Sequence, residues 1–317
     1  MARKRVFISG ATGFAGRHLM SALPASEYIT YGATYPQPPR PDEQNIFFLD
    51  MRSERDVFEA VKAAQPDWIF HLAAVSNVRH SWERRRETME TNVLGTFHLF
   101  EAVKKFAPRA RTLYTSSSDV YGFIAGGRKE AARAFSEDDP FHLLSPYSLT
   151  KFSGELLAKF YSGVEGLDIV IARPFPHTGP GQSADFVCSD WARQVIQIER
   201  GRQKPVIRVG NLDVRRDFTD VRDTVRAYIL LMQKGKNGEV YNICRGRGTS
   251  LREILETFLS SCSKTVRVEQ DSEKMRKMDI PSLFGSNKKI KRETGWEPRI
   301  PLERTLAELL DYWRCRP

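Results

Sequence analysis

Tyr147 and Lys151 stand four residues apart in the segment SPYSLTK, residues 145–151. On a helix, side chains at positions i and i+4 share one face, so the lysine ammonium would lie beside the tyrosine phenol. A neighbouring positive charge lowers the pKa of a phenol from its ordinary value of about 10. The spacing therefore predicts a tyrosine that donates or accepts a proton near neutral pH, although an amphipathic helix also carries this spacing by chance.

A glycine-rich turn, GATGFAG beginning at Gly10, lies upstream of this pair. The apolar run Arg5–Ser9 predicts a buried strand before the turn, and apolar spacing over Phe14–Leu23 predicts a helix after it. Gly10 permits a tight turn, Gly13 lets backbone approach a pyrophosphate, and Gly16 lets the helix pack near the sheet. The helix N-terminus would face the phosphates. Together the two motifs predict a nicotinamide-dependent redox enzyme; an ordinary glycine turn in an α/β protein is the alternative.

Apolar periodicity predicts strands that alternate with helices, which is the βαβ pattern of a parallel sheet. We therefore expect an α/β chain with a Rossmann-type doubly wound sheet and a smaller α/β C-terminal lobe that binds substrate. Shorter strands after residue 173 place the boundary between a dinucleotide-binding domain, 1–173, and a second domain, 174–317, from which segments can return to the first. The expected strands are Ile29–Thr34, Ile46–Leu49, Trp68–Leu72, Arg111–Ser116 and Asp168–Ala172, and the expected helices are Ser53–Ala64, Thr88–Phe106, Pro146–Tyr161, Asp190–Arg200, Asp223–Gln233 and Leu302–Trp313.

The composition suits a soluble enzyme. A chain of 317 residues, 41% of them hydrophobic, is long enough to bury such a sheet and a smaller lobe. No stretch approaches the roughly 18 apolar residues that span a bilayer, and the start MARKR has no signal-peptide core, so we expect a cytoplasmic protein without a membrane partner. The cysteines lack metal-ligand spacing, which predicts reduced structural thiols and no metal site: Cys188, Cys244, Cys262 and Cys315.

The net charge of +10 raises the question of nucleic-acid binding. One basic run, residues 79–86, holds four arginines, but it also contains Trp82 and Glu83 and is followed by Glu87. A solvated helix start or a subunit contact explains this run better than an RNA patch. Excess positive charge also suits a protein that binds two diphosphates. We therefore expect no nucleic-acid partner.

Further motifs recur along essentially the whole chain. The first half carries LD at 49–50, HLAA at 71–74, NVLGT at 92–96 and SSSDVYG at 116–122. The second half carries RPFPHTGPGQ at 173–182, FVC at 186–188, GNLD at 210–213, RDFTDVRD at 216–223 and GSNK at 285–288. The set resembles the extended short-chain dehydrogenase/reductases that modify nucleotide sugars, and among them the GDP-6-deoxy-D-mannose reductases. Those enzymes reduce GDP-4-keto-6-deoxy-D-mannose to GDP-D-rhamnose, and their relatives include GDP-mannose 4,6-dehydratases and GDP-6-deoxytalose synthases.

The resemblance implies a catalytic set of Ser117, Tyr147 and Lys151. Ser117 would hydrogen-bond the C4 oxygen of the sugar, Tyr147 would donate the proton, and Lys151 would also bind the nicotinamide ribose. A hydride delivered to the C4 carbon leaves an alkoxide, which these groups stabilise and protonate. Ser116 and Ser118 are adjacent hydroxyls that could replace Ser117.

The residue type at position 119 bears on the choice between a reductase and a dehydratase. The resemblance implies a glutamate at this position in the dehydratases, where it removes and supplies protons. An aspartate is one methylene shorter, a loss of reach of about 1.5 Å, and misplacement by about 1 Å can cost about 10²-fold in rate. We expect dehydration to be weak or lost, while a purely turn-capping Asp119 is the alternative.

The cofactor is expected to be NADPH, with NADH as the alternative. NAD-binding chains end the second strand with an acidic residue for the ribose 2′-hydroxyl, and the segment 31–36, YGATYP, has none. No arginine follows at once for a 2′-phosphate, although Arg40 could fold back. The resemblance implies adenine contact by Asp50 and backbone contact by residues 72–74. The full expected cofactor set is Gly10, Thr12, Gly13, Phe14, Ala15, Gly16, Asp50, Met51, Leu72, Ala73, Ala74, Asn92, Tyr147, Lys151, Phe175 and His177.

The resemblance also implies how a GDP-sugar substrate would bind. Arg216 and Arg276 match diphosphate-contacting arginines, whose planar fork suits phosphate, and Asp279 matches an acceptor for a ribose hydroxyl. Each could instead be a surface charge. Pro176 replaces a family asparagine and has no side-chain donor, so either His177 or Gln182 compensates or the substrate differs. The full expected substrate set is Ser76, Ser117, Ser118, Gln182, Val187, Arg216, Arg276 and Asp279.

Relatives pair through the two helices expected at 88–106 and 147–161, so the resemblance implies a homodimer built on a four-helix bundle. Two rival functions stay open. One is a 4,6-dehydratase or epimerase, which would recycle a tightly held oxidised cofactor. The other is a non-catalytic nucleotide-sensing or RNA-associated protein on the same fold.

Overall fold

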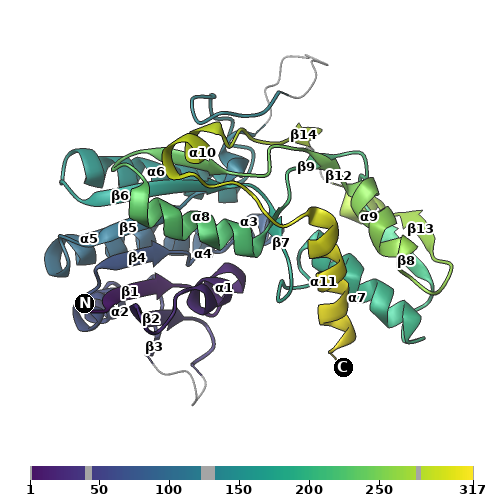
Figure 1. Ribbon diagram of the computed structural model, residues 1–317, viewed down its shortest axis with the longest axis horizontal. Helices are drawn as coiled ribbons and strands as arrows, with labels where there is room; N and C mark the ends of the chain where they lie inside the picture. Colours follow the sequence, from purple (N-terminus) through teal and green to yellow (C-terminus); the bar gives the residue numbers. More distant parts are fainter. Residues whose placement is uncertain (1, 40–44, 123–132, 276–279, 317) are drawn as a thin grey trace.

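The computed structural model describes residues 2–39, 45–122, 133–275 and 280–316. Its centre is a seven-stranded sheet with the order β11-β6-β5-β4-β1-β2-β3, in which every neighbouring pair is parallel. The expected Rossmann-type α/β fold is confirmed (Figure 1). The strands are β1 (Lys4–Ser9), β2 (Tyr28–Thr34), β3 (Ile46–Phe48), β4 (Trp68–His71), β5 (Arg111–Thr115), β6 (Asp168–Pro174) and β11 (Val240–Ile243).

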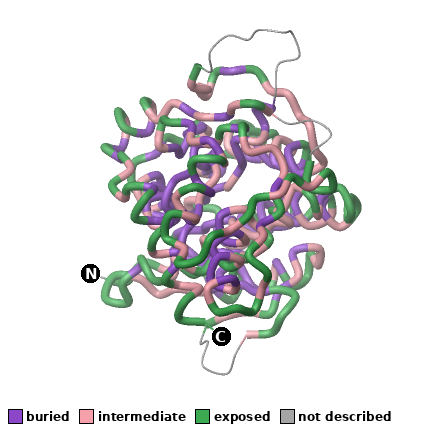
Figure 2. Tube along the Cα trace, turned by 90° about the vertical axis from the view of Figure 1, so that its right-hand side faces the viewer, coloured by how far each residue is buried: buried purple, intermediate pink, exposed green. Residues whose placement is uncertain are grey.

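Helices cover both faces of this sheet. One apolar core joins the sheet to α2 (Glu54–Ala64), α5 (Gly95–Phe106) and α6 (Pro146–Gly163). The other core joins it to α1 (Phe14–Ala22), α8 (Val221–Lys234) and α10 (Lys288–Thr294). Figure 2 shows buried residues in the interior and exposed residues on the outer turns. Because α8, β11 and α10 come late in the chain, the C-terminal half supplies part of the first lobe.

A second, smaller lobe lies to the right of the sheet in Figure 1. Its own apolar core lies between α7 (Val187–Glu199), α9 (Leu251–Ser260) and α11 (Leu302–Arg314) and the parallel pair β8 (Val206–Val209) and β13 (Arg267–Gln270). A short helix, η3 (Ser272–Lys274), follows β13. Short strands join the lobes: β7 (His177–Thr178), β9 (Arg215–Arg216), β10 (Thr219–Asp220), β12 (Thr249–Ser250) and β14 (Ser282–Leu283).

The helix expected over 88–106 is present, but a π-helical turn interrupts it. The Asn92 side chain in this turn bonds both the backbone N–H and the backbone carbonyl of Val75. A π turn adds a residue to the helix and so changes which side chain faces inward, a feature frequent at functional sites. A short preceding helix was not expected from the apolar pattern. The segments are α3 (Val78–Glu83), α4 (Arg85–Met89), the π turn η1 (Glu90–Leu94) and α5.

Helix α6 lies unusually close to β5, because Gly154 faces the Tyr114 ring. A Cβ at Gly154 would stand 1.9 Å from the Tyr114 hydroxyl, which donates a hydrogen bond to the Lys151 carbonyl. We expect Gly154→Ala to lower the free energy of unfolding by about 1–3 kcal/mol through overpacking, measured by urea denaturation. Gly163→Ala in the same helix is the control, since nothing lies within 4 Å of its added Cβ. Equal stability of the two variants would contradict the prediction.

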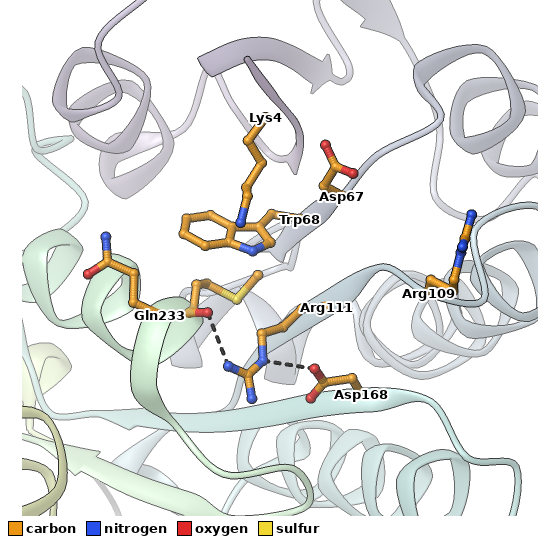
Figure 3. A pocket seen from close by; sticks show the side chains of 8 residues that line it. Lys4, Asp67, Trp68, Arg109, Arg111, Asp168 and Gln233 are labelled. Carbon is orange, nitrogen blue, oxygen red and sulfur yellow. Dashed lines mark hydrogen bonds and ion pairs between the residues drawn. The ribbon is translucent and has the colours of Figure 1, made fainter. Parts of the chain in front are cut away.

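The amino-terminal ends of the strands form a pocket of about 520 Å³ (Figure 3). Lys4, Trp68 and Arg111 begin their strands here. Arg111 pairs with Asp168 at 3.0 Å and donates to the Met232 carbonyl at 3.1 Å, so it ties β5 to β6 and α8. Ligands of doubly wound sheets bind at the opposite, carboxyl ends of the strands. The candidate site is therefore found there.

Candidate active site

The glycine turn between β1 and α1 is tightly packed. Gly10 has φ +72°, and a Cβ there would lie 2.9 Å from the Ala73 nitrogen. A Cβ at Gly16 would lie 2.2 Å from the Gly10 oxygen. Gly13 precedes the first residue of α1, and no side chain caps that helix. The exposed N–H groups of the helix start and the glycine backbone fit a dinucleotide pyrophosphate, which supports the expected role of residues 10–16.

A buried hydrogen-bond chain holds the next loop against this turn. The Ser9 hydroxyl accepts bonds from the N–H groups of residues 72–73 at 3.1 Å. His71 contacts Ser9 through Nδ1 at 2.7 Å and Thr96 through Nε2 at 2.9 Å, and Thr96 donates to the Asn92 carbonyl. Burial and the Lys151 charge lower the His71 pKa to about 3, so the ring is neutral. Nε2 therefore donates to Thr96, and Nδ1 accepts from Ser9.

This chain of hydrogen bonds continues to α6 through Asn92. The Asn92 amide donates to the Thr150 hydroxyl at 3.0 Å, and Thr150 donates to the Tyr147 carbonyl at 2.8 Å. Asn92, an expected cofactor residue, thus fixes both the loop after β4 and the start of α6. Sequence reasoning identified the HLAA motif but not the bonding role of His71, because its partners are distant in sequence.

The N-terminus of α6 is fixed at several points. Ser145 and Ser148 form a reciprocal capping box, and Pro146 occupies the first helical turn. The Ser81 hydroxyl of α3 accepts the Tyr147 N–H at 3.2 Å. Proline and a capping serine both favour a helix start at this position. The phenol of Tyr147 is thereby held on a rigid element.

Ser117 is the serine of its run that reaches Tyr147. It caps the short helix η2 (Ser118–Val120), accepts the Asp119 N–H at 3.1 Å, and lies near enough to Tyr147 to lower the pKa of the phenol. The Ser116 hydroxyl donates instead to Glu155, and Ser118 is buried. The structure therefore brings Ser117, Tyr147 and Lys151 together and gives Ser116 a structural partner.

The expected lowering of the Tyr147 pKa is wrong in this structure. Burial raises the pKa of the phenol, the Asp119 charge raises it further, and only the hydrogen bond with Ser117 lowers it. The Lys151 Nζ lies 5.9 Å from the centre of the Tyr147 ring and donates to the Thr115 carbonyl at 2.7 Å. The helical spacing is as expected, but the loss of hydration around a phenolate dominates the shift, and Lys151 is not among its causes.

Two expected cofactor residues contact each other across the lobes. The rings of Phe14 and His177 stack with centroids 5.9 Å apart and an angle of 9°. Phe175 is buried in a cluster with Tyr121, and its N–H donates to the Ile243 carbonyl. Met51 is buried, and its carbonyl contacts His98 Nδ1 at 3.1 Å.

The expected substrate residues are more scattered. Ser76 is exposed in the loop before α3, and Val187 begins α7. The Gln182 amide donates to the His177 carbonyl and accepts from the Thr178 hydroxyl, so it is satisfied within its own loop. Arg216 in β9 donates to the Ile280 carbonyl at 2.7 Å. Three other expected residues lie outside the described part of the chain: Arg40, Arg276 and Asp279.

In the described ranges, no group of three or more His, Cys, Asp or Glu side chains is placed to hold a metal ion. All four cysteines are free, and Cys188 and Cys244 are buried. No helix in the same ranges is both long and apolar enough to cross a membrane.

Comparison with known proteins identifies the family. The model of the GDP-mannose 4,6 dehydratase family matches residues 7–309. The chain belongs to this family. It is 34% identical to a GDP-6-deoxy-D-mannose reductase from Pseudomonas aeruginosa, over 99% of this chain and 98% of that protein, and 26% identical to a GDP-mannose 4,6-dehydratase from Sinorhizobium fredii, over 97% and 96%. A solved structure of RMD from Pseudomonas aeruginosa complexed with NADPH is similar with a TM-score of 0.87 and 32% identity, over 99% of this chain and all of that one.

The resemblance to extended short-chain dehydrogenase/reductases is thus confirmed. Asp119 and Pro176 are the two positions at which the resemblance implied a departure from the usual residue. The Asp119 charge acts on the Tyr147 phenol, so this position belongs to the site. The Pro176 carbonyl accepts the Thr219 N–H at 2.9 Å, which joins the segment after β6 to the second lobe.

Proposed function

We propose that the chain is a nicotinamide-dependent enzyme that reduces the C4 keto group of GDP-4-keto-6-deoxy-D-mannose to GDP-D-rhamnose. The observation that carries the proposal is the placement of Ser117 next to the Tyr147 phenol, whose pKa it lowers, beside buried Lys151 at the carboxyl end of β5. The 34% identity to a GDP-6-deoxy-D-mannose reductase and the NADPH in a similar structure support the substrate and the cofactor. We further propose that the enzyme acts in the cytoplasm on GDP-sugars and not on nucleic acid.

The residues of the site suit reduction. The bound nicotinamide supplies a hydride to the C4 carbon of the sugar. The raised pKa of Tyr147 keeps the phenol protonated at neutral pH, so it holds the proton that the developing alkoxide needs. Ser117 donates a second hydrogen bond to that oxygen, and Lys151 holds the ribose end of the cofactor.

A 4,6-dehydratase is the rival within the family, since several relatives carry that name. Dehydration needs a base and an acid at the C5–C6 bond, and the shorter Asp119 reaches less far than a glutamate. The two activities are distinguished by their cofactor balance. A reductase consumes reduced cofactor with every turnover, whereas a dehydratase converts GDP-mannose with no net oxidation.

The test is to mix the purified protein with NADPH and GDP-4-keto-6-deoxy-D-mannose, follow NADPH absorbance and identify the product by NMR. We expect stoichiometric oxidation and GDP-D-rhamnose. GDP-6-deoxytalose as the product would keep the reductase but reverse the face of the ketone that receives hydride. No oxidation by folded, NADPH-binding protein would contradict the proposal and point to Pro176 having changed the sugar.

The pH dependence of kcat/KM should report the protonation state of the Lys151 side chain. Burial lowers the Lys151 pKa to about 8, against the opposing Glu155 charge. The ammonium is the form that binds the nicotinamide ribose, and it loses its proton as pH rises through that value. We therefore expect kcat/KM for NADPH to fall above pH about 8. A profile that stays flat to pH 10 or so, near the ordinary lysine pKa of about 10.4, would contradict this.

We also propose that two copies pair through α5 and α6. Leu149, Leu156 and Phe160 lie at i, i+7 and i+11 on α6 and are 45–54% exposed, and Leu94 in η1 and Phe97 in α5 are also exposed. We expect Leu156→Glu to yield monomers in sedimentation velocity experiments, because a carboxylate would be buried at the contact. Val268→Glu, at an exposed apolar position of the second lobe, is the control. A wild-type monomer would contradict the pairing.

A further inference from the structure

Two side chains meet where β2 and β3 end. Tyr35 follows the last residue of β2, and Arg52 lies shortly after β3. The Arg52 Nη2 donates to the Tyr35 hydroxyl at 2.9 Å, and the guanidinium lies 5.5 Å from the centre of that ring. One residue earlier, the hydroxyls of Thr34 and Thr12 are 2.6 Å apart. Arg52 therefore lies beside the point where the second strand touches the glycine turn.

This is the place where dinucleotide-binding sheets distinguish their two cofactors. The adenosine ribose lies at the carboxyl end of the second strand, where an acidic residue binds a 2′-hydroxyl and an arginine accommodates a 2′-phosphate. The described residues that follow β2, YPQPP at 35–39, carry no charge. Among the described residues near this corner, Arg52 supplies a cation, and it follows the end of the neighbouring strand.

Within the described part of the chain, the guanidinium is bonded along one edge only. Nε and Nη2 bond the Asp50 carboxylate at 3.0 and 2.6 Å, and Nη2 also serves Tyr35. Among the described residues, none accepts a hydrogen bond from Nη1. The Arg52 side chain is 34% exposed. A planar fork fixed in this way loses little freedom when it binds a phosphate.

We propose that Arg52, oriented by Asp50 and Tyr35, binds the ribose 2′-phosphate of NADPH and makes the enzyme prefer NADPH to NADH. The inference rests on the proposed function, because it names the cofactor of that site. Asp50 neutralises part of the guanidinium charge, so the preference is moderate and NADH still binds. A single hydrogen bond to a charged group corresponds to about a 10- to 100-fold change in affinity.

The experiment is a fluorescence titration of the full chain with NADPH and with NADH, which differ only in the 2′-phosphate. We expect Arg52→Gln to weaken NADPH binding about 10- to 100-fold and NADH binding less than about threefold. Arg52→Lys keeps the charge without the planar fork, so its NADPH affinity should lie between those of the wild type and Arg52→Gln. Arg55→Gln, which removes the same charge from an exposed position on α2, is the matched control and should change neither affinity.

A second measurement keeps the test valid if Arg52→Gln is poorly folded. The wild-type ratio of NADPH to NADH affinity should fall as salt is added, since the discriminating contact is ionic. Three results would overturn the inference. Folded Arg52→Gln could keep the wild-type ratio of NADPH to NADH affinity, or lose affinity for both cofactors equally. Alternatively, Arg40→Gln, and not Arg52→Gln, could lose the NADPH affinity. Failure of wild-type protein to bind either cofactor would contradict the proposed function itself.

Discussion

Replacement of Tyr147 by phenylalanine is expected to lower kcat by about 10²- to 10⁴-fold, the usual contribution of a positioned proton donor. The ring is buried at the start of α6, so phenylalanine keeps its packing and removes only the hydroxyl, which lies next to Ser117. The measurement is the steady-state rate of NADPH oxidation with the keto sugar. NADPH affinity should change little, because the helix that carries Lys151 is capped independently of the phenol.

Tyr312→Phe, on α11 in the second lobe, is the control for this variant and should retain full activity. Full activity of Tyr147→Phe would exclude the phenol as the proton donor. An unchanged biological effect of a variant that has lost turnover would instead support a non-catalytic, nucleotide-sensing role. The two outcomes are distinguishable because the first is measured as turnover of the purified protein and the second as the effect of the variant in cells.

The largest effect on stability is expected at the ion pair of Glu155 and Arg173. Both side chains are 1% exposed, and two contacts of 2.7 Å join them. Loss of one partner leaves a buried charge without compensation, so Glu155→Leu should cost about 3–5 kcal/mol. A domain is stable by only about 5–15 kcal/mol, so this variant should lose a large share of its free energy of unfolding. Urea denaturation of purified protein measures the difference.

The double variant Glu155→Leu, Arg173→Met tests the cause. Replacing both charges with apolar groups of similar size should restore much of the lost stability, since no unpaired charge remains. Arg173 also donates to the Tyr121 hydroxyl at 2.9 Å, which then lacks a donor, so recovery should be incomplete. A single variant that costs less than about 1 kcal/mol would contradict a strong buried pair.

The pair also bears on the active site. Glu155 lies one helical turn after Lys151 and accepts the Ser116 hydroxyl, while Arg173 extends from β6. The ion pair therefore joins α6 to the end of β5, which Ser117 follows. A partly folded Glu155 variant should lose activity before it loses all structure, because its first local effect is on the loop at 116–121.

Much of the site could be predicted because its motifs are local. The glycine turn must combine a positive φ with close backbone contacts, and few residues other than glycine allow this. Tyr147 and Lys151 need only a helix to share a face. The choice among Ser116, Ser117 and Ser118 could not be made in this way, since three adjacent hydroxyls look alike until one is seen to bond Glu155.

The amino-acid sequence by itself determined the alternation of strands and helices, the glycine turn and the candidate catalytic residues, because these follow from periodicity and short spacings. Only the tertiary structure decided the direction of the Tyr147 pKa shift, since burial is a property of the packed molecule. It also decided the π turn at Asn92, whose partner lies 17 residues away, and the meeting of Arg52 with Tyr35 across paired strands. Hydrogen bonds and hydration depend on neighbours in space, and those neighbours come from distant parts of the chain.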